Sequence, residues 1–165
     1  MCFRINQKET KKLQESKVPI LTWKYVSVDR GGYLRSPIFR SSGRWQEEKV
    51  HFVEKPKDGA GEPYNSSSLD AGTGLYSNRN VYPSENSYWG PLHLLLLETN
   101  PEDVLGANKF QMVAAKTKVL KAFTSKEWSE YTKSFRKEGR ELVLAYPEKI
   151  ARAVKTVRKK AKTKK

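Results

Sequence analysis

Hydrophobic and polar positions alternate in the first third of the chain, which is typical of strands with one covered face. The segment Ile20–Val28 is rich in β-branched and aromatic residues. Alternation places Trp23 and Tyr25 on one face and Lys24 and Val26 on the other. The pattern therefore predicts a long strand that buries aromatic rings on one side.

Turn residues and two further short patterns follow this strand. Asp29–Gly32 supplies two glycines for a tight hairpin, and Tyr33–Phe39 predicts the returning strand. Pro37 cannot donate to a ladder, so this strand is expected at an edge or to end there. A third strand is predicted over Lys49–Glu54.

The middle of the chain changes character twice. Residues 55–74 are rich in Gly, Pro, Ser and Asn and predict a long loop. Residues 74–91 are irregular but contain many large rings, so we expect them to pack or to form a ring-lined surface. Leu92–Glu98 is continuously apolar and predicts a central strand that is buried on both faces.

The remaining pattern predicts a turn, a broken strand and two helices. Thr99–Asn108 is interpreted as a turn, and Lys109–Phe123 as a bulged strand or two strands joined by a bend. Thr124–Glu127 has the spacing of a capping box, and Trp128, Tyr131 and Phe135 recur behind it at helical spacing. A second helix is predicted from Pro147, at its favoured first-turn position.

These elements predict an α+β fold. A mainly antiparallel, twisted sheet over residues 20–123 is followed by two C-terminal helices, the last of them strongly basic. Residues 1–17 are expected to form a polar arm, either a short helix or a loose segment. Residues 18–146 are expected to form a single α+β domain, and residues 147–165 a basic helix and tail.

Charge is unevenly distributed along the chain. The net charge is +14, and residues 126–165 contain fourteen Lys and Arg against five Glu. A concentrated basic terminus favours a polyanionic partner: DNA, RNA, a nucleoprotein or an acidic protein surface. The predicted phosphate contacts are Lys149, Arg152, Lys155, Arg158, Lys159, Lys160 and Lys162. A solvated charged helix without a partner is the alternative.

Aromatic and basic residues are interleaved before the central strand. Stacking of unpaired bases on these rings, beside Arg44 or Arg79, would suit single-stranded nucleic acid. The candidate stacking residues are Trp45, Tyr76, Tyr82, Tyr88 and Trp89. The interpretation that the pattern favours is that these rings are core, because a small sheet needs large side chains to fill its covered face.

Few residues could support metal or nucleophilic chemistry. Cys2 is the single cysteine, and His51 and His93 are the two histidines, so we expect no metal site, no cofactor and no internal disulfide. The opening residues predict no secretory signal, and the longest apolar run is far below the roughly 20 residues that span a bilayer. We therefore expect an intracellular protein with no membrane partner.

One enzymatic alternative stays open. An NAD-dependent ADP-ribosyltransferase holds its dinucleotide with an Arg or His, a Ser-containing strand and a later Glu. Arg35, Ser77 and either Glu85 or Glu98 occur in that order. The composition nevertheless favours a protein that is not an enzyme.

The region Trp23–Phe123 resembles a domain of uncharacterised bacteriophage proteins. The resemblance is carried by an opening strand, a following Trp and the segments "YLRSPI", "GLYS", "LLLLETNPEDVLG" and "VAAKTKVLKAF". It implies a viral origin, a small α+β domain and a place in the cytoplasm of an infected bacterium. No catalytic residue is implied by the resemblance.

The sequence thus predicts a non-catalytic protein that binds nucleic acid or a nucleoprotein through its cationic C-terminus. The alternative is a host-directed effector that binds and inhibits an acidic host protein. Both interpretations explain the charge, and they differ in whether the tail or the folded body makes the specific contact.

Overall fold

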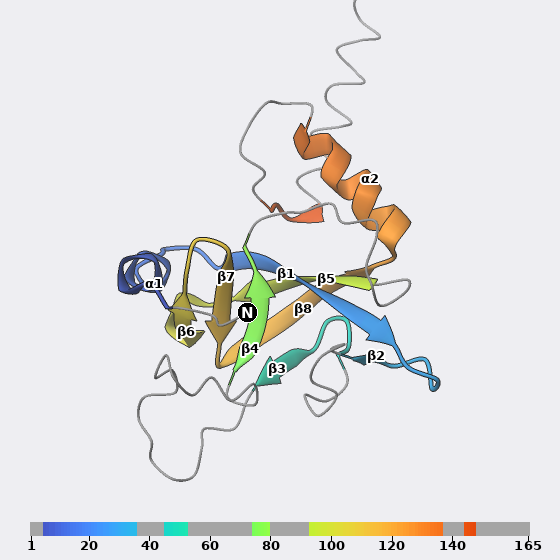
Figure 1. The fold of residues 1–165 in the computed structure, drawn as a ribbon, viewed down its shortest axis with the longest axis horizontal. Coiled ribbons are helices and arrows are strands. Elements are labelled where there is room, and N and C mark those ends of the chain that lie inside the picture. Colours follow the sequence, from blue (N-terminus) through green and yellow to red (C-terminus); the bar gives the residue numbers. More distant parts are fainter. Residues whose placement is uncertain (1–4, 36–44, 53–73, 80–92, 137–143, 148–165) are drawn as a thin grey trace, which may run out of the picture.

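A computed structural model describes residues 5–35, 45–52, 74–79, 93–136 and 144–147. Within these ranges the chain forms eight strands, two α-helices and one 3₁₀ turn (Figure 1). The helices are α1 (Gln7–Gln14) and α2 (Ser125–Arg136), and the turn is Pro101–Asp103. The strands are β1 (Ile20–Val28), β2 (Leu34–Arg35), β3 (Val50–Phe52), β4 (Leu75–Asn78), β5 (His93–Thr99), β6 (Val104–Ala107), β7 (Gln111–Ala114) and β8 (Lys116–Phe123).

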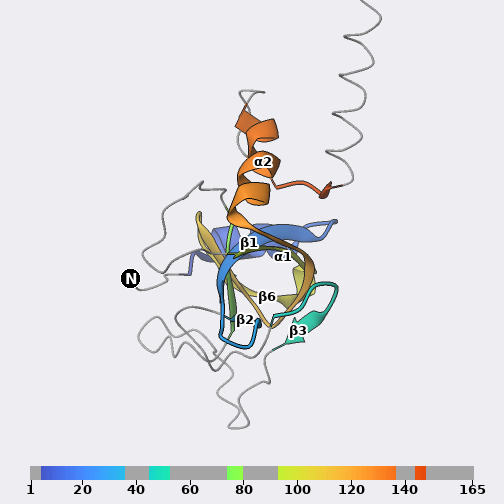
Figure 2. The same cartoon turned by 90° about the vertical axis from the view of Figure 1, so that its right-hand side faces the viewer.

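The strands form one antiparallel sheet in the order β3-β8-β5-β1-β4-β7-β6, with β2 paired to the end of β1. The predicted α+β fold with a mainly antiparallel sheet is confirmed. Figure 2 shows the sheet curling beneath α2. The second, basic helix of the prediction lies outside the described residues, apart from Pro147.

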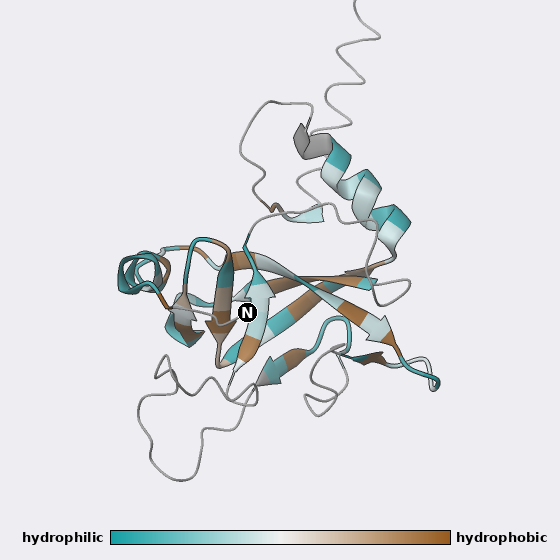
Figure 3. Ribbon diagram, in the orientation of Figure 1, coloured by the Kyte–Doolittle hydropathy of each residue, from teal (hydrophilic) through white to brown (hydrophobic). Residues whose placement is uncertain are grey.

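The two central strands were predicted correctly. β1 has the expected bounds, and β5 lies between β1 and β8, with Leu94, Leu95, Leu96 and Leu97 all buried. A strand that is covered on both faces needs apolar residues at every position, which explains the unbroken leucine run. Figure 3 shows brown, hydrophobic colour on β5, whereas the neighbouring β8 alternates between brown and teal.

Two short strands were missed. Residues 74–91 were interpreted as irregular, but β4 pairs with both β1 and β7. Thr99–Asn108 was interpreted as a turn, yet only Pro101–Asp103 turns and β6 follows at once. Gly106 lies within that strand, opposite Val113, and a Cβ there would be 2.8 Å from Cδ1 of Ile5. This glycine allows a close approach of the chain and does not mark a turn.

Helix α1 closes the edge of the sheet at β6. The Asn6 N–H donates to the Ala107 carbonyl at 2.8 Å, and the Ala107 N–H donates to Thr10 Oγ1 at 2.9 Å. Gln14 Nε2 donates to the Val104 carbonyl at 2.9 Å. Leu13 packs into a core cluster with Val104 and other residues of β6 and β7. The helix therefore satisfies backbone groups that an open edge would present to another chain.

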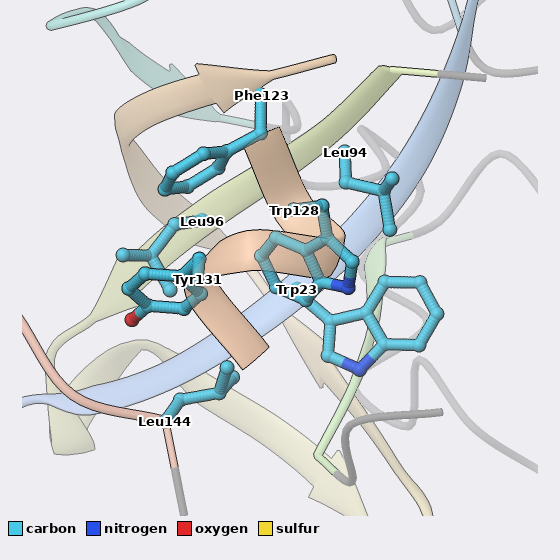
Figure 4. Packing of buried hydrophobic residues seen from close by; sticks show 7 residues of the cluster. All are labelled: Trp23, Leu94, Leu96, Phe123, Trp128, Tyr131 and Leu144. Carbon is cyan, nitrogen blue, oxygen red and sulfur yellow. The ribbon is translucent and has the colours of Figure 1, made fainter. Parts of the chain in front are cut away.

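Helix α2 covers the outer face of the sheet. The Glu127 N–H donates to Thr124 Oγ1 and the Thr124 N–H donates to Glu127, so the predicted capping box is confirmed. Figure 4 shows the rings of α2 against the strands. This outer cluster consists of Trp23, Leu94, Leu96, Phe123, Trp128, Tyr131 and Leu144.

A second cluster fills the inner, concave face of the sheet. Its members come from β1, β4, β5, β8 and the segment before β3: Val26, Trp45, Leu75, Leu95, Leu97 and Val119. The buried hydroxyls of Thr99 and Thr117 bond to each other on this side at 2.8 Å. The sheet is thus packed on both faces, and residues outside the two clusters remain for contact with a partner.

Candidate nucleic-acid interface

β8, which is the last strand along the chain, has three lysines on its outer face. In β8, Thr117 and Val119 are buried on the inner face, so alternation turns Lys116 and Lys118 outward. The register shift between Leu96 and Leu97 of β5 also brings Lys121 onto the outer face, where it pairs with Leu96. We call Lys116, Lys118 and Lys121 the lysine row.

Among the described residues, two members of the lysine row have partners. Lys118 Nζ lies 3.2 Å from a carboxylate oxygen of Glu48, whose side chain is 71% exposed. Such an exposed pair is worth about 0–1 kcal/mol, so a phosphate can replace it at little cost. Lys121 Nζ lies 5.2 Å from the centre of the Phe123 ring, and Lys116 is exposed.

The described chain ends beside this row. Leu144 is buried in the outer cluster, and the Tyr131 hydroxyl donates to the Ala145 carbonyl. The Tyr146 hydroxyl then donates to the Glu98 carboxylate, and Glu98 pairs with Lys118 across β5 and β8. The basic segment that begins at Lys149 therefore follows an anchor placed next to the lysine row.

Most of the predicted contact residues lie outside the described residues. These are Arg44, Tyr82, Tyr88, Trp89, Lys149, Arg152, Lys155, Arg158, Lys159, Lys160 and Lys162. Their roles stay predictions.

Trp45 belongs to the core, as the interpretation of the aromatic rings as core residues predicts. The side chain is 3% exposed, and its ring centre lies 4.7 Å from that of His51. Tyr76 is half-buried, and burial raises the pKa of its hydroxyl. A buried indole presents no face to a base, so Trp45 is corrected from a stacking residue to a core residue.

Arg79 is held by groups of the protein itself. Its Nη1 lies 2.7 Å from a carboxylate oxygen of Glu9 and also donates to the Asn108 carbonyl. This hydrogen bond to Arg79 lowers the pKa of Glu9. The guanidinium links α1 to the β6–β7 turn, and its predicted phosphate contact is replaced by this structural role.

An unexpected polar group lies on the inner face. Lys24 Nζ donates to the Tyr76 carbonyl at 3.0 Å and lies 5.7 Å from the Trp45 ring centre. Burial lowers the pKa of the Lys24 ammonium to about 8. His51 Nε2 accepts a hydrogen bond from the Gln46 N–H at 3.2 Å, and burial lowers its pKa. No carboxylate among the described residues pairs with Lys24.

The residues of the transferase alternative are not brought together. Arg35 forms an ion pair with Asp29 and is opposite Ser27 at one end of β1, whereas Glu98 is opposite Leu21. Six strand positions correspond to about 20 Å. Ser77 is buried on β4, and Glu85 lies outside the described residues. The distance between Arg35 and Glu98 argues against a shared dinucleotide site.

Sequence reasoning missed the lysine row and Lys24. The signal for the row was present in "KTKVLK", in which lysines occupy every other position of the predicted strand and then shift with the bulge. The alternation of β1 did place Lys24 on the face opposite Trp23, but the pattern did not show that this face is also covered. That face is covered because Leu75 of β4 and Trp45, which precedes β3, pack in the inner cluster.

Within the described ranges, no three His, Cys, Asp or Glu side chains gather where they could hold a metal ion, and neither helix has the length and apolar character to cross a membrane. The chain matches no protein-family model, no curated protein and no solved structure. The resemblance to bacteriophage proteins stays a prediction.

Proposed function

We propose that the protein binds nucleic acid, alone or within a nucleoprotein, and that it does so without catalysis. The contacts are made to phosphates by the lysine row of β8 together with the basic segment that begins at Lys149. Phosphate contacts of this kind set orientation and affinity but do not read sequence.

A single observation carries the proposal: the anchor of Tyr146 on Glu98 beside Lys118. The anchor starts the basic segment next to three lysines that already share one face of β8. In the proposed interaction, a polyanion bound at the lysine row engages the basic segment that follows the anchor as well. Lysines scattered around the molecule would offer no such surface.

Counterion release sets the expected size of the effect. If about five phosphates are engaged, the logarithm of the binding constant falls with the logarithm of salt concentration at a slope of about −4 to −5. Glu48 lowers the local charge only weakly, because its carboxylate is largely exposed. Affinity should therefore be steeply salt-dependent and similar for unrelated sequences.

The test is a salt titration of the full chain on fluorescent oligonucleotides of random sequence. Replacing Lys116, Lys118 and Lys121 with Gln should weaken binding uniformly and make the slope shallower by about 2 to 3. Replacing the nine Lys and Arg of residues 149–165 with Gln should remove most of the remaining slope.

The matched control is the triple replacement of Lys8, Lys11 and Lys12 with Gln. These lysines lie on α1 at the opposite edge of the sheet, and the control removes the same number of charges. Equal loss in both triple variants would show that net charge alone acts and would contradict a defined surface. If the full chain binds neither DNA nor RNA at low salt, the proposal is wrong and an acidic protein partner takes its place.

A further inference from the structure

The turn before β3 holds an acidic residue in an unusual backbone conformation. Among the described residues, Glu48 is the one non-glycine residue with a positive φ, at +61°. This left-handed conformation costs free energy for a residue that has a Cβ, so it persists only where the surrounding structure fixes it. The place that the turn gives to the Glu48 side chain is therefore the first thing to examine.

Backbone hydrogen bonds fix this turn against β8. The Glu48 N–H donates to the Val119 carbonyl at 2.8 Å, and the Val119 N–H donates to the Lys49 carbonyl at 3.0 Å. The Lys49 N–H also donates to the Gln46 carbonyl at 3.3 Å, which closes the turn. Residues 46–49 are thus joined to the middle of β8 and cannot leave it without breaking these bonds.

The turn places the Glu48 carboxylate at the middle member of the lysine row. Its Oε2 lies 3.2 Å from Lys118 Nζ, and the side chain of Lys118 is 38% exposed. The adjacent acid, Glu47, has a different partner, because its Oε1 accepts from the Ala122 N–H at 3.3 Å. The conformation of Glu48 therefore brings one carboxylate to one lysine of the row.

A second carboxylate beside Lys118 is held by another group. Glu98 lies opposite Lys118 on β5, so the two side chains share the outer face. Glu98 accepts a hydrogen bond from the Tyr146 hydroxyl and so belongs to the anchor of the C-terminal segment. Within the described ranges, the ion pair of Lys118 is formed with Glu48 alone. Glu48 is thus the acid that a phosphate has to displace there.

We propose that Glu48 is an internal competitor of phosphate: its carboxylate occupies Lys118 in the free protein and leaves when a polyanion binds. This inference rests on the proposed function and adds a regulation of the same surface. Carboxylate and phosphate oxygens are both anionic acceptors for an ammonium group, so they compete for Lys118. Because the ion pair is exposed, the competition lowers affinity by a few-fold and does not abolish binding.

The experiment measures the affinity of the full chain for fluorescent oligonucleotides of random sequence, by anisotropy. Glu48→Gln removes the charge and keeps the length of the side chain. It should raise affinity about 2- to 5-fold at low salt. The gain should shrink as salt is added, because salt screens the ion pair and the phosphate contacts alike.

Two controls remove an equal charge elsewhere. Glu15→Gln breaks a comparable exposed ion pair, in which Glu15 Oε1 lies 3.7 Å from Lys11 Nζ on α1, at the opposite edge of the sheet. Glu47→Gln changes the same turn, and its amide oxygen can still accept from the Ala122 N–H. Both controls should raise affinity less than Glu48→Gln does.

The decisive comparison is made in a Lys118→Gln background. Glu48 has no ammonium group to occupy there, so Glu48→Gln should gain no more affinity than Glu15→Gln. Inorganic polyphosphate is a second probe, because it offers phosphates without bases, and Glu48→Gln should bind it more tightly by a similar factor. An undiminished gain in the Lys118→Gln background would overturn the inference, as would a gain for oligonucleotides with none for polyphosphate.

The outcomes separate this inference from the proposed function. Suppose that Glu48→Gln binds no more tightly than Glu15→Gln, while replacement of the lysine row still weakens binding. The inference is then wrong and the proposed function stands. If neither the natural chain nor Glu48→Gln binds DNA or RNA at low salt, the proposed function is wrong and the inference fails with it. Binding by Glu48→Gln alone would support both.

Discussion

Neighbouring residues of β1 enter two cores of different character. On the outer face, Trp23 packs against Trp128 of α2 with ring centres 5.7 Å apart, in a cluster of rings and leucines. On the inner face, Lys24 is half-buried; its Nζ donates to the Tyr76 carbonyl and lies 5.7 Å from the centre of the Trp45 ring. The same strand thus contributes an aromatic ring to the outer cluster and a charged ammonium group to the inner face.

The difference shows which groups stabilise the fold and which reduce its stability. Burial of the outer rings removes apolar surface from water, at about 25 cal/mol per Å². Burial of the Lys24 ammonium costs free energy, because the described residues provide no carboxylate for it. The outer cluster should therefore dominate stability, and substitutions on the inner face should be able to raise it.

The largest effect is expected at Trp128, which contacts Trp23, Phe123 and Tyr131 within the outer cluster. Trp128→Ala should lower the free energy of unfolding by about 3–5 kcal/mol, because it leaves a cavity between α2 and the sheet. Urea unfolding followed by circular dichroism measures the loss. Trp128→Phe is the control: it keeps a ring and removes the buried Nε1, which has no hydrogen-bond partner among the described residues, so its cost should be much smaller. A loss below about 1 kcal/mol for Trp128→Ala would show that α2 is not anchored here.

A gain of stability is expected at Lys24. Lys24→Met fills the same space without a charge, so the free energy of unfolding at pH 7 should rise by about 1–3 kcal/mol. Burial lowers the folded-state pKa from 10.5 to about 8, so the unfolded state binds more protons between these values. Stability of the natural chain should therefore rise with pH from 8 to 10.5, and the advantage of Lys24→Met should shrink over that window.

Urea unfolding at pH 7, 8.5 and 10 measures this advantage. Lys12→Met, at an exposed position of α1, is the control and should show no pH-dependent gain. A loss of stability in Lys24→Met at pH 7 would mean that the hydrogen bond to Tyr76 outweighs the cost of burying the charge.

The sequence predicted what depends on local pattern. The bounds of β1, the buried leucine strand and the capping box at Thr124 follow from periodicity and hydrogen-bonding chemistry over a few residues. The break between β7 and β8 also follows locally, because the apolar alternation shifts at Ala114–Ala115.

What the sequence did not predict depends on pairing between distant segments. β4 and β6 are each four residues long, which is too short for a clear period of apolar residues. Both form strands by pairing with β7, which lies between them. Gly106 was interpreted as a turn residue. Its contact with Ile5 joins residues about 100 positions apart, and the local sequence does not show such a contact. The lysine row could be predicted only in part, because its third member depends on a register shift within β5 and β8.

The smallest effect expected from the inner core is a pH dependence due to His51. Its Nε2 accepts a hydrogen bond from the Gln46 N–H, which needs the neutral form, and its ring packs against Trp45 at a tilt of 38°. Burial, helped by the charge of Lys49, lowers the folded-state pKa below the 6.5 of the unfolded chain. The unfolded state therefore takes up the proton first, and the contribution of neutral His51 should be complete above pH 6.5 and lost progressively below it.

His51→Gln isolates the contribution of His51 protonation to the free energy of unfolding. A glutamine oxygen can also accept from the Gln46 N–H, but the glutamine side chain does not titrate. The difference in unfolding free energy between the natural chain and His51→Gln should be constant from pH 7 to 8 and fall by roughly 1 kcal/mol or less as the pH is lowered to 5. The carboxylates whose pKa values are lowered, among them Asp29 and Glu127, add their own loss only near and below pH 4.5, where their unfolded-state forms take up protons. A difference that grows in favour of the natural chain as the pH falls would mean that protonated His51 is stabilised in the fold, and the inner core would then tolerate a second positive charge beside Lys24.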